Sequence, residues 1–350
     1  MFSKLRSLIF KLDPETAHSL AIKSLKLNLV SNIFNQNIDE SFFKTKIFNK
    51  ELNNPIGMAA GFDKNAEVYN SLFKLGFGFV EVGTITPIQQ YGNPKPRVFR
   101  LIEDQALINR LGFNNHGAEE VSNRIKLNKK IGLLGINIGP NKDSDDRLKD
   151  YLIGLKTFYE VADYITINIS SPNTENLRNF HEQSKLEELL KSINKEKKIL
   201  ETTIPIVVKI SPDIIENQIN QISEILLENN IEGIIISNSS EATRNELIDA
   251  QKHQKGGLSG KPIENKSNIL INKFYKLLKG RIKIIGVGGV DSGKSAYAKF
   301  LAGADLIQLY TGMVFKGPNI TYMIKKELSE LLLRDGVKNF TEIIGNKTLS

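Results

Sequence analysis

Short β-rich apolar runs alternate with stretches of helical periodicity from about residue 47 onward, and this alternation limits the possible folds more than any other feature. The runs cover residues 56–61, 77–86, 133–139, 164–171, 205–211, 233–240, 282–289 and 306–312. Strands that are each followed by a helix form βα units, whose strands pair in parallel. Eight such units are the number that closes a (β/α)8 TIM barrel. An open, doubly wound sheet is the alternative, because strand number alone does not establish closure.

Two segments between these runs are too long for simple crossovers. Between residues 87 and 131, RVFRLI is followed by QALINRLGF, which predicts two extra strands laid over one end of the barrel. The second long segment, residues 240–283, includes the turn-rich run KGGLSGKP. Long loops after barrel strands commonly build binding sites. We therefore expect a barrel with decorated loops over residues 47–350.

The first 46 residues differ from the rest because they have helical periodicity without a predicted strand. Their apolar positions form two stripes, Phe2, Leu5, Leu8, Ile9 and Leu12, then Ala17, Leu20, Ala21 and Leu25. Asp13 and Pro14 suit the N-cap and first turn of the second of two amphipathic helices. Taken alone, these residues favour a helical cap packed on the barrel. Seven Lys and Arg against four Asp and Glu also suit an anionic membrane surface.

Composition excludes several kinds of chemistry. The chain has no Cys, which rules out disulfides, iron–sulfur clusters, thiolate zinc sites and cysteine-based mechanisms. Its four His are scattered, so no metal site is predicted. An excess of 47 Lys and Arg over 39 Asp and Glu is too diffuse to choose among nucleic acid, lipid, an anionic substrate and a solvated surface. No apolar run approaches the roughly 18 residues of a membrane span.

Polar or small residues follow every predicted strand. The carboxyl ends of barrel strands meet on one rim, where functional groups gather. In chain order the rim positions are Asp63, Lys64, Thr84, Asn137, Asn168, Ser171, Lys209, Ser237, Asn238, Ser239, Gly288, Gly289, Tyr310 and Thr311. Each of them alone could simply cap a strand or form a turn, but contributions from all eight strands together favour a functional site.

Individual rim residues indicate what this site binds. Gly286, Gly288 and Gly289 suit either a tight turn or a phosphate bound by backbone N–H groups, to which Gly260 could add a donor. Lys64 and Lys209 suit a Schiff base, an anionic substrate group or charge developing on a cofactor. Amide side chains that donate and accept suit a flat heterocycle, and the candidates are Asn109, Asn168, Asn173 and Asn238.

Several motifs follow one another in a recognisable order. They are FKLDPETAH, GMAAGFDKNA, VGTITP, PKPRVFRL, INRLGFNN, GINIGPNK, TINISSPNT, VVKISPD, GGLSGKP, IIGVGGVDSG and IQLYTGMVFKGP. In these motifs and their spacing, nearly the whole chain resembles the quinone-linked (class 2) dihydroorotate dehydrogenases, flavin enzymes of pyrimidine biosynthesis. Ser171 lies where class 1 relatives carry a cysteine, so the absence of Cys agrees with class 2.

The resemblance implies FMN as cofactor and dihydroorotate as substrate. The implied FMN-binding residues are Ala60, Gly61, Phe62, Asp63, Lys64, Thr84, Asn137, Asn168, Lys209, Ser237, Gly260, Gly289, Tyr310 and Thr311. The implied substrate-binding residues are Lys64, Asn109, Arg110, Leu111, Gly112, Phe113, Asn168, Asn173, Asn238 and Ser239. Ser171 matches the catalytic base, which takes the C5 proton while the C6 hydride passes to FMN and orotate forms. The Pro that follows it disfavours α conformation at Ser171 and so favours an extended turn there.

The resemblance also reinterprets residues 1–46. It implies that this helical extension lies in the membrane surface and forms a tunnel for the quinone, in place of a simple cap. His18 and Arg100 match positions near the quinone. The implied location is the cytoplasmic side of the inner membrane, in peripheral contact, and nucleic acid is not an implied partner.

Three other functions would suit parts of this sequence. A flavin-dependent tRNA dihydrouridine synthase would suit a basic barrel, but its usual catalytic cysteine is missing. A Schiff-base aldolase would use Lys64 or Lys209 and would be colourless. A membrane-surface scaffold without catalysis would bind no chromophore.

Overall fold

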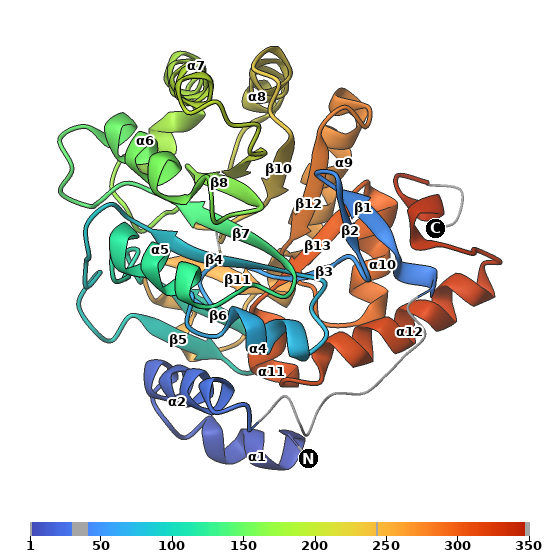
Figure 1. Ribbon diagram of the computed structural model, residues 1–350. Helices are drawn as coiled ribbons and strands as arrows, with labels where there is room; N and C mark the ends of the chain where they lie inside the picture. Colours follow the sequence, from blue (N-terminus) through green and yellow to red (C-terminus); the bar gives the residue numbers. More distant parts are fainter. Residues whose placement is uncertain (1, 30–40, 243, 347–350) are drawn as a thin grey trace.

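Parallel strands form a closed barrel at the centre of the molecule (Figure 1). The computed structural model describes residues 2–29, 41–242 and 244–346. Within these residues the barrel strands, in chain order, are β3 (Ile56–Met58), β4 (Phe79–Ile85), β7 (Leu133–Ile138), β8 (Tyr164–Asn168), β9 (Ile206–Ile210), β10 (Gly233–Ile236), β12 (Lys283–Val287) and β13 (Leu306–Leu309). Each strand pairs in parallel with the next, and β13 pairs with β3. The predicted barrel is confirmed, and the open sheet is ruled out.

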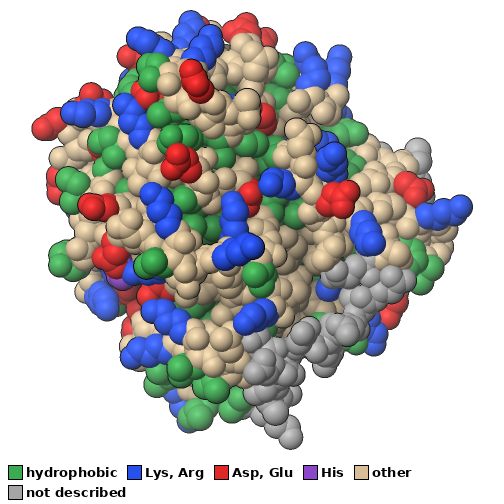
Figure 2. All heavy atoms as spheres, in the orientation of Figure 1, with side chains coloured by type: hydrophobic (Ala, Val, Ile, Leu, Met, Phe, Trp, Pro, Cys, Tyr) green, Lys and Arg blue, Asp and Glu red, His purple; other side chains and the backbone are tan. Residues whose placement is uncertain are grey.

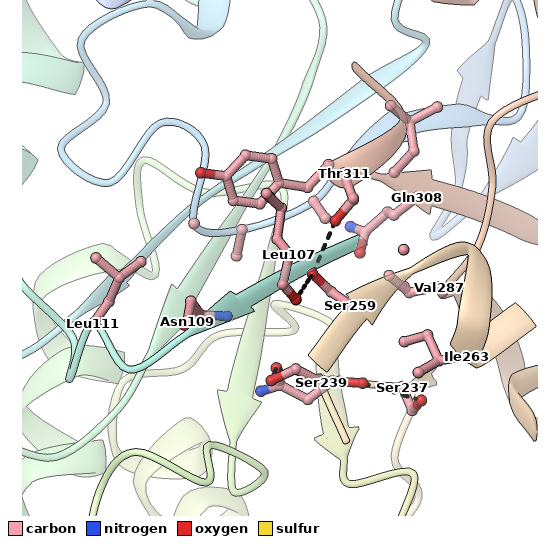
Figure 3. Close-up of a pocket in the computed structure, with 18 of the residues that line it drawn as sticks. Leu107, Asn109, Leu111, Ser237, Ser239, Ser259, Ile263, Val287, Gln308 and Thr311 are labelled. Carbon is pink, nitrogen blue, oxygen red and sulfur yellow. Dashed lines mark hydrogen bonds between the residues drawn. The ribbon is translucent and has the colours of Figure 1, made fainter. Parts of the chain in front are cut away.

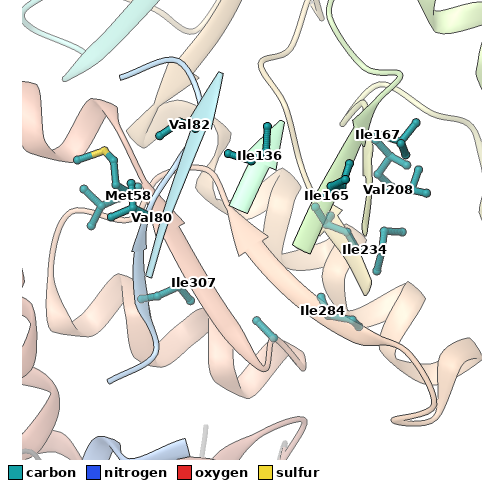
Figure 4. Close-up of a cluster of buried hydrophobic side chains, with 14 of the residues drawn as sticks. Met58, Val80, Val82, Ile136, Ile165, Ile167, Val208, Ile234, Ile284 and Ile307 are labelled. Atoms are coloured by element: carbon teal, nitrogen blue, oxygen red, sulfur yellow. The ribbon is translucent and has the colours of Figure 1, made fainter. Parts of the chain in front are cut away.

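Helices surround this barrel. They are α4 (Tyr69–Lys74), α5 (Ala118–Leu127), α6 (Arg147–Phe158), α7 (Gln183–Ile199), α8 (Glu216–Glu228), α9 (Glu264–Leu278), α10 (Gly293–Ala302), α11 (Thr311–Lys316) and α12 (Ile320–Arg334). Short 3₁₀ helices are η1 (Ser41–Phe43), η2 (Leu177–His181), η3 (Ala250–His253), η4 (Lys261–Ile263) and η5 (Phe340–Ile343). The outward strand side chains, such as Val80, Ile165 and Ile234, belong to the main apolar core (Figure 4).

Alternation along the strands divides the side chains between this outer core and the barrel interior. On β4, Val80 and Val82 belong to the outer core, whereas Phe79 belongs to a second apolar cluster. That second cluster also holds Ile47 and Leu52 of the hairpin β1 (Thr45–Ile47) and β2 (Lys50–Leu52). The hairpin therefore packs at the end of the barrel where the strands begin, and the end where they finish carries the polar residues.

A small antiparallel sheet, which we call the overlay sheet, covers the carboxyl end of the barrel. It contains the two predicted strands, β5 (Val98–Leu101) and β6 (Ala106–Asn109). It also contains β11 (Gly257–Gly260), which pairs with β6. The run around β11 was expected to be a turn, and that expectation was wrong. The run is rich in glycine, which is unusual in strands, and it becomes a strand by pairing with β6, about 150 residues away along the chain.

The N-terminal segment forms the two predicted helices, α1 (Phe2–Ile9) and α2 (Pro14–Lys26). Asp13 caps α2 by accepting a hydrogen bond from the Thr16 N–H at 2.9 Å, as its position before Pro14 predicts. Arg97, the residue just before β5, donates to both carboxylate oxygens of Glu15 on α2. Strand β1 begins at Thr45, one residue before the proposed boundary at residue 46, so the expectation of no strand in this segment was slightly wrong.

Candidate active site

A cavity lies at the carboxyl ends of the barrel strands, against the overlay sheet (Figure 3). Most residues predicted for the site line it: Ala60, Gly61, Lys64, Thr84, Asn109, Leu111, Gly112, Phe113, Asn168, Ser171, Asn173, Lys209, Ser237, Asn238, Ser239, Gly260, Gly289, Tyr310 and Thr311. Leu107 and Ser259 line it from the overlay sheet, and Ile263 and Val287 add apolar surface. The fold thus gathers residues from both ends of the sequence around one space.

A buried carboxylate organises the barrel interior near this cavity. Glu81 on β4 accepts hydrogen bonds at one oxygen from Asn137 Nδ2, at 2.8 Å. Its other oxygen accepts from the Tyr164 hydroxyl at 3.0 Å, Thr166 Oγ1 at 3.1 Å and Gln308 Nε2 at 3.1 Å. These donors come from β7, β8 and β13, so the carboxylate ties four strands together.

The amide of Asn137 connects the Glu81 carboxylate to side chains in the cavity wall. Because its Nδ2 donates to Glu81, its Oδ1 is free to accept from Thr84 Oγ1 at 2.6 Å and from Asn168 Nδ2 at 3.2 Å. Asn168 Nδ2 also donates to Thr84 Oγ1 at 2.9 Å. Thr84 and Asn168 line the cavity, whereas Asn137 does not. Asn137 therefore orients two cavity-lining side chains.

Ser171 follows β8 in a tight turn that holds its hydroxyl at the cavity. Ser171 Oγ accepts the N–H of Asn173 at 3.2 Å, across Pro172. Arg178 supports the turn because its guanidinium donates to the backbone carbonyls of Ser170 at 3.2 Å and Ser239 at 3.1 Å. Ser171 as a whole is only 5% exposed and lines the cavity, so its hydroxyl faces an enclosed space.

Two lysines bring buried positive charge to the cavity. Burial lowers the pKa of Lys209, and the charge of Glu81 acts in the opposite direction. Within the described residues the Lys209 amine has no hydrogen-bond partner. Burial lowers the pKa of Lys64 to about 8, with Glu15 raising it and Arg97 lowering it. Both amines therefore suit an anion or a strong acceptor in the cavity.

Other polar groups at the cavity also lack partners. The backbone N–H group of Gly289 donates to no acceptor in the described part of the chain. The buried Oε1 of Gln308 accepts no hydrogen bond there either. Buried polar groups are rarely left unsatisfied. One backbone donor just after β12 and an acceptor on β13 are thus open to a bound molecule.

Three predicted site residues point elsewhere. Arg110 donates to the Pro96 carbonyl at 2.8 Å and lies over the Phe99 ring, so its guanidinium braces the overlay sheet. The Asp63 carboxylate accepts the backbone N–H groups that follow it at Glu67 and Val68, each at 2.8 Å. The Phe62 ring packs edge-on against Tyr310 at 5.7 Å. The structure does not bring these three side chains into the cavity.

The two predicted quinone-site residues lie between the N-terminal helices and the barrel. His18 on α2 packs edge-on against Phe62, with ring centroids 5.2 Å apart. Burial, then the charge of Lys64, lowers the pKa of His18 to about 3, so its imidazole is neutral. Arg100 donates to the carbonyls of Phe10 and Leu12, after α1, at 3.2 and 2.8 Å. It thus helps to hold the helix pair to the overlay sheet.

Sequence reasoning missed Glu81, Gln308, Ser170 and Ser259. Ser259 bonds Thr311 Oγ1 at 2.9 Å, and Ser170 Oγ donates to Asn168 Oδ1 at 2.7 Å. A signal for the first two exists, because each is a polar residue inside an otherwise apolar strand. Such a residue is stable in a barrel interior only with partners.

Comparison with known proteins places this cavity in a family. The dihydroorotate dehydrogenase family model matches residues 42–332. A dihydroorotate dehydrogenase (quinone) from Bartonella tribocorum is 47% identical over 341 residues, 96% of this chain and 94% of that one. The one from Bartonella henselae is 45% identical over 338 residues, 95% and 92% of the two chains.

Solved structures agree with this result. The ligand-free DHODH of Eimeria tenella has a TM-score of 0.91 at 35% identity, covering 95% of this chain and 99% of that one. Its complex with ferulenol gives 0.90 at 35% identity. The chain belongs to the dihydroorotate dehydrogenase family. Within that family it is an enzyme of the quinone-dependent class, EC 1.3.5.2, which oxidises dihydroorotate with a quinone as acceptor.

Proposed function

We propose that the cavity binds FMN and that the enzyme uses it to convert (S)-dihydroorotate to orotate in pyrimidine biosynthesis, with a membrane quinone as the final acceptor. The observation that carries this proposal is the set of groups without partners. A lysine amine, a backbone N–H group and an amide oxygen in one cavity match a ligand with a polar heterocycle at one end and a phosphate at the other. FMN, when bound, supplies the acceptor for a hydride.

The residues suited to hold FMN fall into two groups. Those suited to its ring are Ala60, Gly61, Thr84, Asn168, Lys209 and Ser237, and those suited to its phosphate end are Gly260, Gly289, Tyr310 and Thr311. Lys209 brings a positive charge, which favours negative charge on a reduced ring. Asn137, Phe62 and Asp63 support this wall from behind, and Lys64 lies at its edge.

The opposite part of the cavity suits dihydroorotate. Lys64 supplies a positive charge for the substrate carboxylate. The surrounding amides and hydroxyls, Asn109, Asn168, Asn173, Asn238 and Ser239, suit its ring, with Leu111, Gly112 and Phe113 closing the space. Arg110 takes part by bracing the segment that carries Leu111 rather than by contact. Fixing the ring in one orientation lowers the entropic part of the barrier.

Ser171 is the proposed base. Its Oγ takes the C5 proton of dihydroorotate as its own hydroxyl proton passes to a water relay, and enclosure in the cavity keeps bulk water away from this exchange. The backbone N–H of Asn173 donates to the same oxygen and so favours its negatively charged form. The turn and Arg178 keep the hydroxyl aimed into the cavity, which is the positioning that a weak base requires.

The N-terminal helices are the proposed quinone and membrane elements. Within the described part of the chain, no helix is long and apolar enough to cross a bilayer. Leu8 on α1, Leu12 in the turn after it and Leu20 on α2 are 63%, 40% and 48% exposed. Figure 2 shows apolar side chains mixed with Lys and Arg at this end of the molecule. This surface suits peripheral binding to the cytoplasmic face of the inner membrane, with His18 and Arg100 near the entering quinone.

We expect Leu8→Asp, Leu12→Asp and Leu20→Asp together to abolish binding to anionic lipid vesicles. Each change removes exposed apolar surface and adds a charge that anionic lipid repels, so partition should fall by about 100-fold or more. Cosedimentation with vesicles measures this. The matched control replaces Leu127, Ile131 and Ile199 with Asp, because these apolar residues are 84%, 61% and 64% exposed and lie away from the N-terminal helices. Equal loss in both variants would contradict the proposed membrane surface.

The visible spectrum of the purified protein tests the whole proposal. We expect a yellow flavin band that dihydroorotate bleaches and a quinone restores. A colourless protein that borohydride traps with a carbonyl substrate would instead indicate a Schiff-base enzyme. A colourless protein inert to both reagents would support a scaffold.

A further inference from the structure

A buried lysine lies behind the loop that ends β12. Lys299 on α10 has 0% of its surface exposed. Its amine donates to Asn268 Oδ1 at 2.8 Å and to Ser267 Oγ at 3.2 Å, both on α9. These partners are neutral, and no ion pair among the described residues includes Lys299. A buried ammonium without a counter-ion is costly, so it calls for an anion nearby.

The loop next to this lysine is the one that carries the open backbone donor of Gly289. Ser267 Oγ donates to the Val287 carbonyl at 2.6 Å, which links the Lys299 amine to the last residue of β12. A Cβ on Gly286 would lie 3.2 Å from Lys299 Cδ, and one on Gly288 would lie 3.3 Å from Ser267 Cβ. The lysine and its serine partner therefore pack directly against the loop backbone.

The conformation of this loop leaves the N–H group of Gly289 available. Gly288 and Gly289 have φ values of +114° and +77°, and a Cβ on Gly289 would lie only 2.3 Å from Glu264 Cβ. Only glycine suits position 289, because the positive φ disfavours other residues and a Cβ there would clash with Glu264. The loop lines the cavity, and the N–H group of Gly289 has no acceptor among the described residues.

We propose that Lys299 is a positioning residue for the phosphate of FMN, supplying the positive charge behind the loop whose N–H groups bind that phosphate. It does so without contact, through Ser267 and the loop backbone. The phosphate in turn adds negative charge near a buried ammonium that forms no direct ion pair among the described residues. This inference rests on the proposed function, because it needs FMN in the cavity.

Local charges are consistent with this role. Burial lowers the pKa of Lys299 to about 7, and the Glu264 carboxylate raises it. Burial raises the pKa of Glu264, and the charge of Asp291 acts in the same direction. The charges of Lys299, Lys261 and Lys294 act in the opposite direction. A bound dianion favours the charged form of a nearby lysine. FMN binding should therefore keep Lys299 protonated at neutral pH.

The test compares FMN with riboflavin, which lacks the phosphate. The flavin-free protein is titrated with each compound, and dissociation constants are read from flavin fluorescence. For Lys299→Met we expect the FMN constant to rise by about tenfold or more and the riboflavin constant by less than about twofold. Lys325→Met is the control, because Lys325 is another buried lysine, on α12, and its loss should leave the FMN to riboflavin ratio unchanged.

A second variant covers the case in which Lys299→Met does not fold. Asn268→Asp places a carboxylate next to the amine and supplies the missing counter-ion. It should raise the melting temperature of the flavin-free protein while weakening FMN binding selectively. If either variant changes FMN and riboflavin affinity equally, or changes neither, the inference is overturned. If the unaltered protein binds riboflavin as tightly as FMN, the proposed phosphate site itself is wrong.

Discussion

Ser171→Ala should slow reduction of the bound flavin by dihydroorotate by roughly 10²–10⁴-fold, the range that a lost general base typically costs. The substitution removes the oxygen that accepts the C5 proton, and no other ionisable side chain replaces it in the turn. Flavin should stay bound, because Ser171 lies with the residues suited to the substrate. Anaerobic stopped-flow absorbance measures the reduction rate, and the spectrum of the isolated protein measures flavin content.

Ser211→Ala is the matched control. Ser211 follows β9, precedes Pro212 and accepts the N–H of Asp213 at 3.1 Å, the same local turn that surrounds Ser171. It does not line the cavity. Ser211→Ala removes the same kind of turn hydrogen bond as Ser171→Ala but leaves the proposed base in place. Fast bleaching in Ser171→Ala, or an equal loss in both variants, would show that Ser171 is not the base.

Glu81→Leu should lower the free energy of unfolding by about 4 kcal/mol or more, because four buried donors would lose their acceptor at about 1–3 kcal/mol each. Those donors lie on three further strands of the barrel. Urea unfolding followed by far-ultraviolet circular dichroism measures the change. Glu81→Gln keeps one acceptor oxygen and should lose less, so the two variants should rank in that order.

Glu119→Leu is the control for this series, because Glu119 is an exposed carboxylate on α5. Exposed substitutions of this kind usually change stability by about 0.5 kcal/mol or less. A loss in Glu81→Leu no larger than in this control would mean that the buried carboxylate does not hold the barrel interior together.

The barrel could be predicted from the sequence because periodicity is a local property. Each β-rich run becomes a strand through its own side chains, and the polar residues after it reach the rim by the rule of parallel strands. The same logic placed Ser171, Lys64 and Lys209 at the cavity. It failed at β11, whose run is rich in glycine and becomes a strand only by pairing with β6.

Side-chain direction could not be predicted in the same way. Arg110 and Asp63 lie in segments that border the cavity, yet each turns toward backbone groups that only the folded chain supplies. Glu81 and Gln308 were overlooked because their partners come from distant strands.

The overlay sheet lies between the cavity and the N-terminal helices, touching both. On the proposed function it acts as a partition, with the pyrimidine on one side and the route for the lipid-soluble oxidant on the other. Mutations on the helix side could then accumulate without disturbing recognition of the pyrimidine. Compounds that block the oxidant's route should accordingly be selective between species, whereas mimics of orotate should not.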